Sequence, residues 1–99
     1  MATLYISEYA SIGGIGNFPV QSPLEPSVTS QTVAIAGTSA QSSTFNDNTN
    51  FVRLHTDAIC SVKFGADPTA AATDARMAVN QTEYFAVHPG HKVAVITNT

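Results

Sequence analysis

Short runs in which apolar and polar residues alternate recur along the last two thirds of the chain. A period of two is typical of β-strands that are buried on one face. The runs are bounded by Gly, Pro, Asn or Asp, which favour turns. They predict strands over residues 32–36, 51–56, 59–64 and 82–87. The short apolar runs at 76–79 and 92–97 predict two further strands.

The segments between these runs have the composition of turns. Residues 46–50 are all Asn, Asp or Thr, and His88-Pro89-Gly90-His91 places Pro and Gly at the second and third positions of a turn. The Ser- and Thr-rich segment 38–45 is compatible with one further, weaker strand. Strands at a spacing of roughly 8–12 residues, with no helical apolar stripe, are typical of a sandwich or barrel. The pattern predicts an all-β fold, a small antiparallel β-sandwich or jelly-roll-like barrel of about 6–7 strands.

The first thirty residues follow a different pattern. Pro19, Pro23 and Pro26 exclude a helix and a central strand, and favour extended, polyproline-like backbone. We therefore expect residues 1–30 to form an extended N-terminal arm and residues 31–99 to form the β-sandwich body. The arm carries apolar residues that would anchor it on a neighbouring surface: Tyr5, Tyr9, Ile12, Ile15 and Phe18.

Composition narrows the function classes. Only 11% of residues are charged, against about 25% in an average soluble domain. Four basic residues and a net charge of −3 do not provide a patch that neutralises several phosphates, so nucleic-acid binding is not expected. No apolar run is long enough to span a membrane, so no membrane partner is expected. Arg53 and Arg76 each either pair with a carboxylate across a subunit contact or lie on a solvated strand face.

Residue types that carry chemistry are present but not in a catalytic pattern. Cys60, the single cysteine, lies in an apolar run, which predicts a buried, unreactive thiol. Strand alternation places His55 and Asp57 on the face opposite Cys60. The spacing of His55, His88 and His91 matches no standard zinc motif. We therefore expect neither an enzyme, a metal site nor a cofactor.

Several segments together resemble a group of small virion proteins of tailed bacteriophages. They are the strand ending in Cys60, the turn Phe-Gly-x-x-Pro-Thr-Ala at 64–70, Glu-x-Phe-x-Val at 83–87, and Pro-Gly-x-Lys-Val-Ala-Val-Ile at 89–96. The opening residues 1–9 are also similar. The resemblance implies a β-sandwich or jelly-roll-like protein on a phage particle, made in the host cytoplasm.

Within that group, the expected role is a capsid decoration (cement) protein on the capsid surface. Such a protein would stabilise the head by bridging major capsid protein subunits, as a homo-oligomer and specifically a homotrimer. Two alternatives remain open. One is another virion part, such as a neck, tail or head-fibre component that contacts the host surface. The other is a small glycan- or peptide-binding module with Tyr84, His88 and His91 near the ligand.

Overall fold

The computed structural model describes residues 2–15 and 18–98, and this part of the chain contains β-strands and no helix. The strands are β1 (Thr3–Tyr9), β2 (Ile12–Ile15), β3 (Phe18–Pro23), β4 (Thr29–Ala34), β5 (Ala40–Gln41), β6 (Phe51–Thr56), β7 (Cys60–Gly65), β8 (Ala75–Met77), β9 (Thr82–Ala86) and β10 (Lys92–Thr97).

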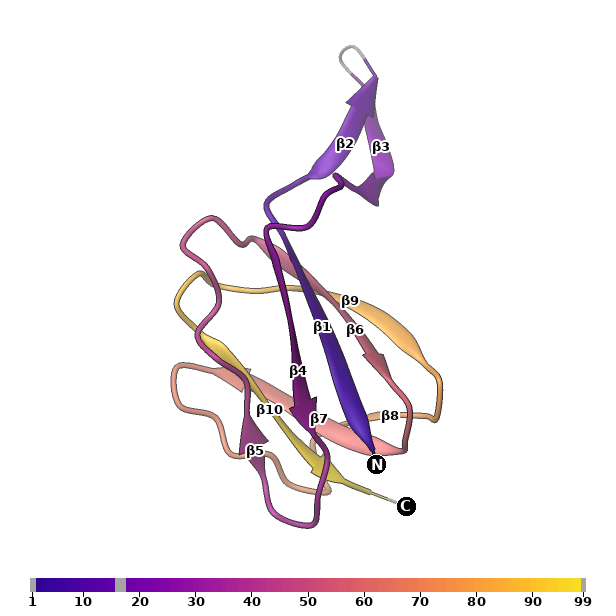
Figure 1. Ribbon diagram of the computed structural model, residues 1–99, viewed down its shortest axis with the longest axis vertical. Coiled ribbons are helices and arrows are strands. Elements are labelled where there is room, and N and C mark those ends of the chain that lie inside the picture. Colours follow the sequence, from indigo (N-terminus) through magenta and orange to yellow (C-terminus); the bar gives the residue numbers. More distant parts are fainter. Residues whose placement is uncertain (1, 16–17, 99) are drawn as a thin grey trace.

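The strands form two four-stranded sheets and one two-stranded hairpin, and every pair is antiparallel. The first sheet has the order β4-β1-β6-β9 and the second has the order β5-β10-β7-β8. The two sheets form the layers of a sandwich (Figure 1). The predicted small antiparallel β-sandwich is therefore confirmed. The described residues contain more strands than expected, because three of them lie in the first thirty residues.

The core lies between the two sheets, and strand alternation explains its composition. Leu4, Ile6, Val52 and Leu54 point inward from the first sheet, and Cys60, Val62, Val93 and Val95 do so from the second. Phe45, in the segment that joins β5 to β6, fills the core from one side and is 1% exposed. Burial on a single face gives β6 the period of two on which the sequence prediction relied, whereas β7 and β10 also bury residues of the opposite face.

The expected boundary between arm and body is wrong for the first nine residues. Residues 3–9 form β1, which pairs with β4 on one side and β6 on the other and is thus a central strand of the body. The physical reason is that Leu4, Ile6 and Glu8 are buried in alternation, so β1 provides one inner face of the sandwich. Of the predicted arm, the described residues between β1 and β4 lie outside the two large sheets.

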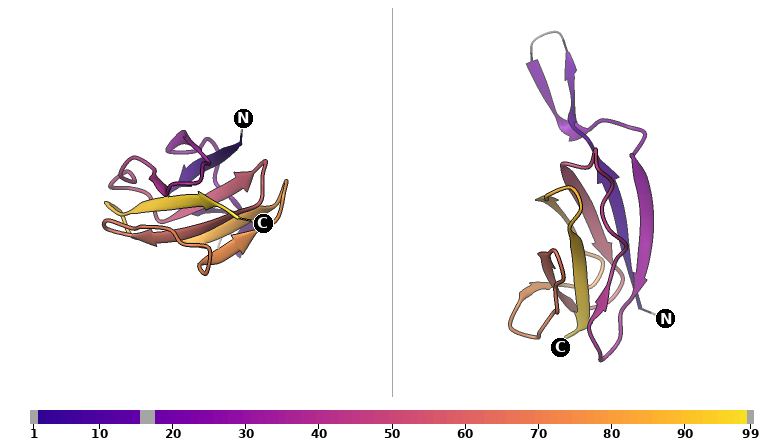
Figure 2. Two further views of the ribbon diagram at one scale, coloured as in Figure 1. Left: turned by 90° about the horizontal axis from the view of Figure 1, so that it is seen from below. Right: turned by 90° about the vertical axis from the view of Figure 1, so that its left-hand side faces the viewer.

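That segment is a hairpin and not the single extended stretch that its prolines suggested. β2 and β3 pair through Ile12 with Pro23, Gly14 with Pro19 and Ile15 with Phe18. Proline is tolerated there because, among the described residues, β3 pairs with β2 alone and so lies at a sheet edge. The hairpin projects from one end of the sandwich, opposite the end where β1 begins and β10 ends (Figures 1 and 2). With it, the molecule measures 46 × 25 × 22 Å.

A buried carboxyl group fixes the base of the hairpin. Glu8 is 1% exposed and points into the sandwich near the end of β1. Its Oε1 accepts hydrogen bonds from the Asn46 N–H and the Thr49 hydroxyl, both at 2.8 Å, and its Oε2 accepts one from Gln31 Nε2 at 3.0 Å. Asn46 and Thr49 belong to the turn before β6, and Gln31 belongs to β4. The carboxyl group therefore joins β1, β4 and this turn.

We predict that Glu8→Ala lowers the free energy of unfolding by about 3 kcal/mol or more, because the buried Thr49 hydroxyl and two part-buried donors, of Asn46 and Gln31, lose their acceptor. Urea denaturation of both proteins measures the change. Glu83→Ala, at a half-buried glutamate on the edge strand β9, is the control and should cost less than about 1 kcal/mol. A Glu8 variant as stable as the control would contradict this role.

Candidate interaction surface

The outer face of the first sheet carries a group of aromatic and basic side chains. We call Tyr5, Phe51, Arg53, His55 and Tyr84 the aromatic face. Their places follow from the register, because Tyr5 lies opposite His55 and Arg53 opposite Tyr84 on neighbouring strands. The Tyr5 and His55 rings are 6.3 Å apart between centroids. Tyr84 is 54% exposed, so this face leaves a large aromatic ring open to contact.

The hairpin adds a second apolar surface beside this face. Phe18 is 77% exposed, Leu24 54% and Ile12 45%. Residues 10–28 contain one charged side chain, Glu25. A two-stranded hairpin is only marginally stable in water by itself. Its apolar side chains therefore gain the most free energy when another surface covers them.

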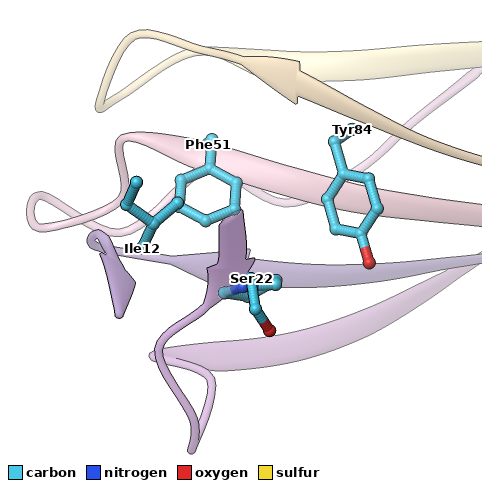
Figure 3. A pocket seen from close by; sticks show the side chains of 5 residues that line it. Ile12, Ser22, Phe51 and Tyr84 are labelled. Atoms are coloured by element: carbon cyan, nitrogen blue, oxygen red, sulfur yellow. The ribbon is translucent and has the colours of Figure 1, made fainter. Parts of the chain in front are cut away.

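A pocket of about 370 Å³ lies where the hairpin meets the aromatic face. Ile12, Ser22 and Pro23 line it from the hairpin, and Phe51 and Tyr84 line it from β6 and β9. Figure 3 shows the Phe51 ring beside Ile12 and the Tyr84 ring on the neighbouring strand. Phe51 and Tyr84 are diagonal neighbours, since Phe51 pairs with Ala86 and Arg53 with Tyr84. The pocket joins the hairpin and the aromatic face into one continuous surface.

Tyr9, at the end of β1, attaches the hairpin segment to the sandwich. It is buried, its ring stacks on Phe51 with centroids 5.4 Å apart, and its hydroxyl donates a 2.8 Å hydrogen bond to Glu25 Oε2. Burial raises the pKa of the Tyr9 hydroxyl above 10.0, and the hydrogen bond to Glu25 and its charge add to this, while Ser7 and Arg53 oppose it. Tyr9 thus connects the body to the segment that leads out of the hairpin.

The structure brings some of the predicted contact residues together and separates others. Tyr5 and Arg53 lie on the aromatic face, and Ile12 and Phe18 are exposed on the hairpin. Tyr9 is instead an internal contact, for the reasons just given. Ile15 lies in β2, but its side chain is outside the described part of the structure.

Arg76 lies far from this group in the fold. It is on β8, at the edge of the second sheet, where it pairs in register with Ser61 of β7. The two arginines are therefore on different sheets, and only Arg53 belongs to the candidate surface.

Three of the surface's residues were not singled out from the sequence. Phe51 begins a predicted strand and alternates outward with Arg53 and His55, which was the available signal. Ser22 and Leu24 flank Pro23 in a segment without periodicity, and their places depend on a hairpin that the sequence pattern did not predict.

The residues considered for nucleophilic chemistry are apart. Cys60 is fully buried in the core, with Sγ 3.6 Å from Thr56 Oγ1. Burial raises the pKa of its thiol, against a smaller lowering by Thr56. His55 is on the outer face with Nδ1 2.7 Å from Thr82 Oγ1, and Asp57 Oδ1 accepts a hydrogen bond from the Thr3 N–H. These three side chains do not form a catalytic group.

Comparisons with models of protein families, with curated protein sequences and with solved structures find no match to this chain. Within residues 2–15 and 18–98, no helix is long and apolar enough to cross a membrane. In the same residues, no group of three or more His, Cys, Asp and Glu side chains is arranged to hold a metal ion.

The raised pKa of Tyr9 predicts how stability changes in alkali. A folded-state pKa above the unfolded value favours the protonated hydroxyl, so its contribution is complete below pH 10.0 and is lost as pH rises through the folded pKa. Tyr9→Phe should lower the free energy of unfolding by about 1 kcal/mol near neutral pH and flatten the alkaline decline.

Urea denaturation across the alkaline range measures both effects. Tyr84→Phe is the matched control, since its hydroxyl is on an exposed ring. An alkaline decline in the Tyr9 variant as steep as in the parent protein would contradict the assignment.

Proposed function

We propose that this protein is a bacteriophage capsid decoration (cement) protein, which stabilises the head by bridging major capsid protein subunits. The observation that carries the proposal is the projecting β2–β3 hairpin, with Phe18 and Leu24 exposed and almost no charge along it. The sequence resemblance to small virion proteins of tailed phages is the reason for proposing a phage capsid as the partner.

The two parts of the molecule suit this role in different ways. The sandwich is a compact body, and no buried side-chain N or O atom in its described residues lacks a hydrogen-bond partner. The hairpin offers an unpaired backbone edge and apolar side chains, which add a strand or fill a groove on a partner. Together they allow the body to sit over a joint between capsid subunits while the hairpin reaches onto a neighbour. A trimer on the capsid surface would present three such hairpins.

Many copies on a symmetric shell also make modest contacts sufficient. Each hairpin buries only a few side chains, so its contact with one subunit is small. Linked contacts raise the overall affinity because later binding events are intramolecular. The low charge of the chain, 11% of residues, is in keeping with a protein whose surfaces are largely covered by other protein subunits.

A second candidate function is the binding of a glycan or peptide. The pocket of about 370 Å³ favours it, because Phe51 and Tyr84 offer two aromatic rings beside the polar Ser22. Neither His88 nor His91 lines this pocket, so the ligand site expected around Tyr84 would not include them. Binding of glycans by the isolated protein, abolished by Tyr84→Ala, would favour this candidate over decoration.

The decoration proposal is tested by Phe18→Ser and by a matched control. Capsids purified without this protein are mixed with each variant and separated by sedimentation, and bound protein is measured. Phe18→Ser should weaken binding by about 30-fold or more, as expected for a central contact residue. Val79→Ser changes a side chain that is 53% exposed on the body and should bind as the parent does.

Thermal unfolding establishes that both variants are folded. Equal binding by Phe18→Ser and the parent would overturn the proposed role of the hairpin. Analytical ultracentrifugation of the isolated protein tests the trimer, and a monomer at all concentrations, both free and when eluted from capsids, would contradict it.

A further inference from the structure

The connection between β9 and β10 brings two histidines into contact. The His88 and His91 rings are 5.1 Å apart between centroids and inclined at 58°. They flank Pro89 and Gly90, and the His91 N–H donates a 3.1 Å hydrogen bond to the His88 carbonyl, which closes the turn. Gly90 has φ of 85°, the conformation that a type II turn requires at its third position. The turn therefore places the two imidazole rings next to each other in space, although the residues are three positions apart in the sequence.

The turn is held to the core by a second set of backbone hydrogen bonds. The Gly90 N–H donates to the Phe45 carbonyl at 3.3 Å, and the Phe45 N–H donates to the His91 carbonyl at 2.8 Å. The Phe45 side chain is buried in the core. The backbone that carries both imidazoles is thus fixed before any ligand arrives, which lowers the entropy cost of binding.

The spacing of the rings suits two ligands of one metal ion. With Zn–N bonds of about 2.0–2.1 Å, two imidazoles on a tetrahedral ion have ring centres roughly 5 Å apart. Imidazole nitrogen is also a preferred ligand of zinc, copper and nickel. We propose that His88 and His91 together chelate one divalent transition-metal ion, with Zn²⁺ as the reference ion.

This site differs from a structural zinc site, and neither histidine lines the pocket between the hairpin and the aromatic face. No third His, Cys, Asp or Glu in the described residues completes it, so water fills the remaining coordination positions and folding does not require the metal. The sequence spacing of the histidines matches no standard motif, and the turn makes them neighbours in space. His55, the third histidine, lies on the aromatic face beside Tyr5.

Titration of Zn²⁺ into the full-length protein near neutral pH tests the proposal. Calorimetry should give one ion per chain, and nuclear magnetic resonance should show shifts of the His88 and His91 ring signals. His88→Ala and His91→Ala should each weaken binding by at least about tenfold, since even changes outside the first ligand shell cost about 10- to 100-fold. His55→Ala is the matched control and should bind Zn²⁺ as the parent does.

Thermal unfolding without metal shows whether each variant is folded. Retention of the parent affinity by folded His88→Ala or His91→Ala would overturn the proposal. An equal loss in His55→Ala, or no binding by the parent at millimolar Zn²⁺, would overturn it as well. None of these results depends on capsids, so the metal site and the proposed decoration function are tested separately.

Discussion

The hydrogen bonds to the buried carboxyl group of Glu8 hold the rest of the structure in register. They join the end of β1, where the chain leaves the sandwich, to β4, where it returns, and to the turn that precedes β6. The Glu8 carbonyl also accepts a 2.7 Å hydrogen bond from the Val28 N–H. Both ends of the excursion through the hairpin are therefore fastened to one residue. Leaving the buried Thr49 hydroxyl without this acceptor would cost more free energy than its hydrogen bond contributes.

The hydrogen bonds of Glu8 explain how a small sandwich can hold a marginally stable hairpin in a projecting position. Among the described residues, β2 and β3 pair only with each other. Tyr9 adds a second attachment, because it is buried against Phe51 and bonded to Glu25. Rigid support at the base and apolar side chains farther out give the hairpin a defined direction without covering it. That combination is what adhesion to a neighbouring subunit requires.

The sequence predicted the body well because a single physical cause operates there. The strand 51–56 buries one face, so its alternation is visible in the residues. The predicted bounds of 51–56 and of 92–97 both agree with the structure. The pattern was read less well where tertiary context decides. Prolines suggested that residues 1–30 form one arm, yet Leu4 and Ile6 alternate with polar residues and make β1 a central strand.

The candidate surface was only partly predictable for a related reason. Ile12 and Phe18 could be chosen from the sequence because they are apolar in a segment rich in Gly and Pro. The pairing of β2 with β3 leaves no strong periodic signal, so the pocket between Ile12 and Tyr84 required the structure. The sequence does not predict the Glu8 network, because nothing in the residues near Glu8 shows that its carboxyl group is buried or which donors it bonds. Asn46 and Gln31, which supply two of them, are 38 and 23 residues away.

Amide hydrogen exchange of the protein free and bound to capsids tests the central claim most directly, namely that the hairpin is the part that a partner covers. The account predicts that amides of β2 and β3 exchange much faster than those of β1 in the free protein, and that they become strongly protected on the capsid. Hairpin amides that exchange as rapidly on the capsid as in solution would contradict the account.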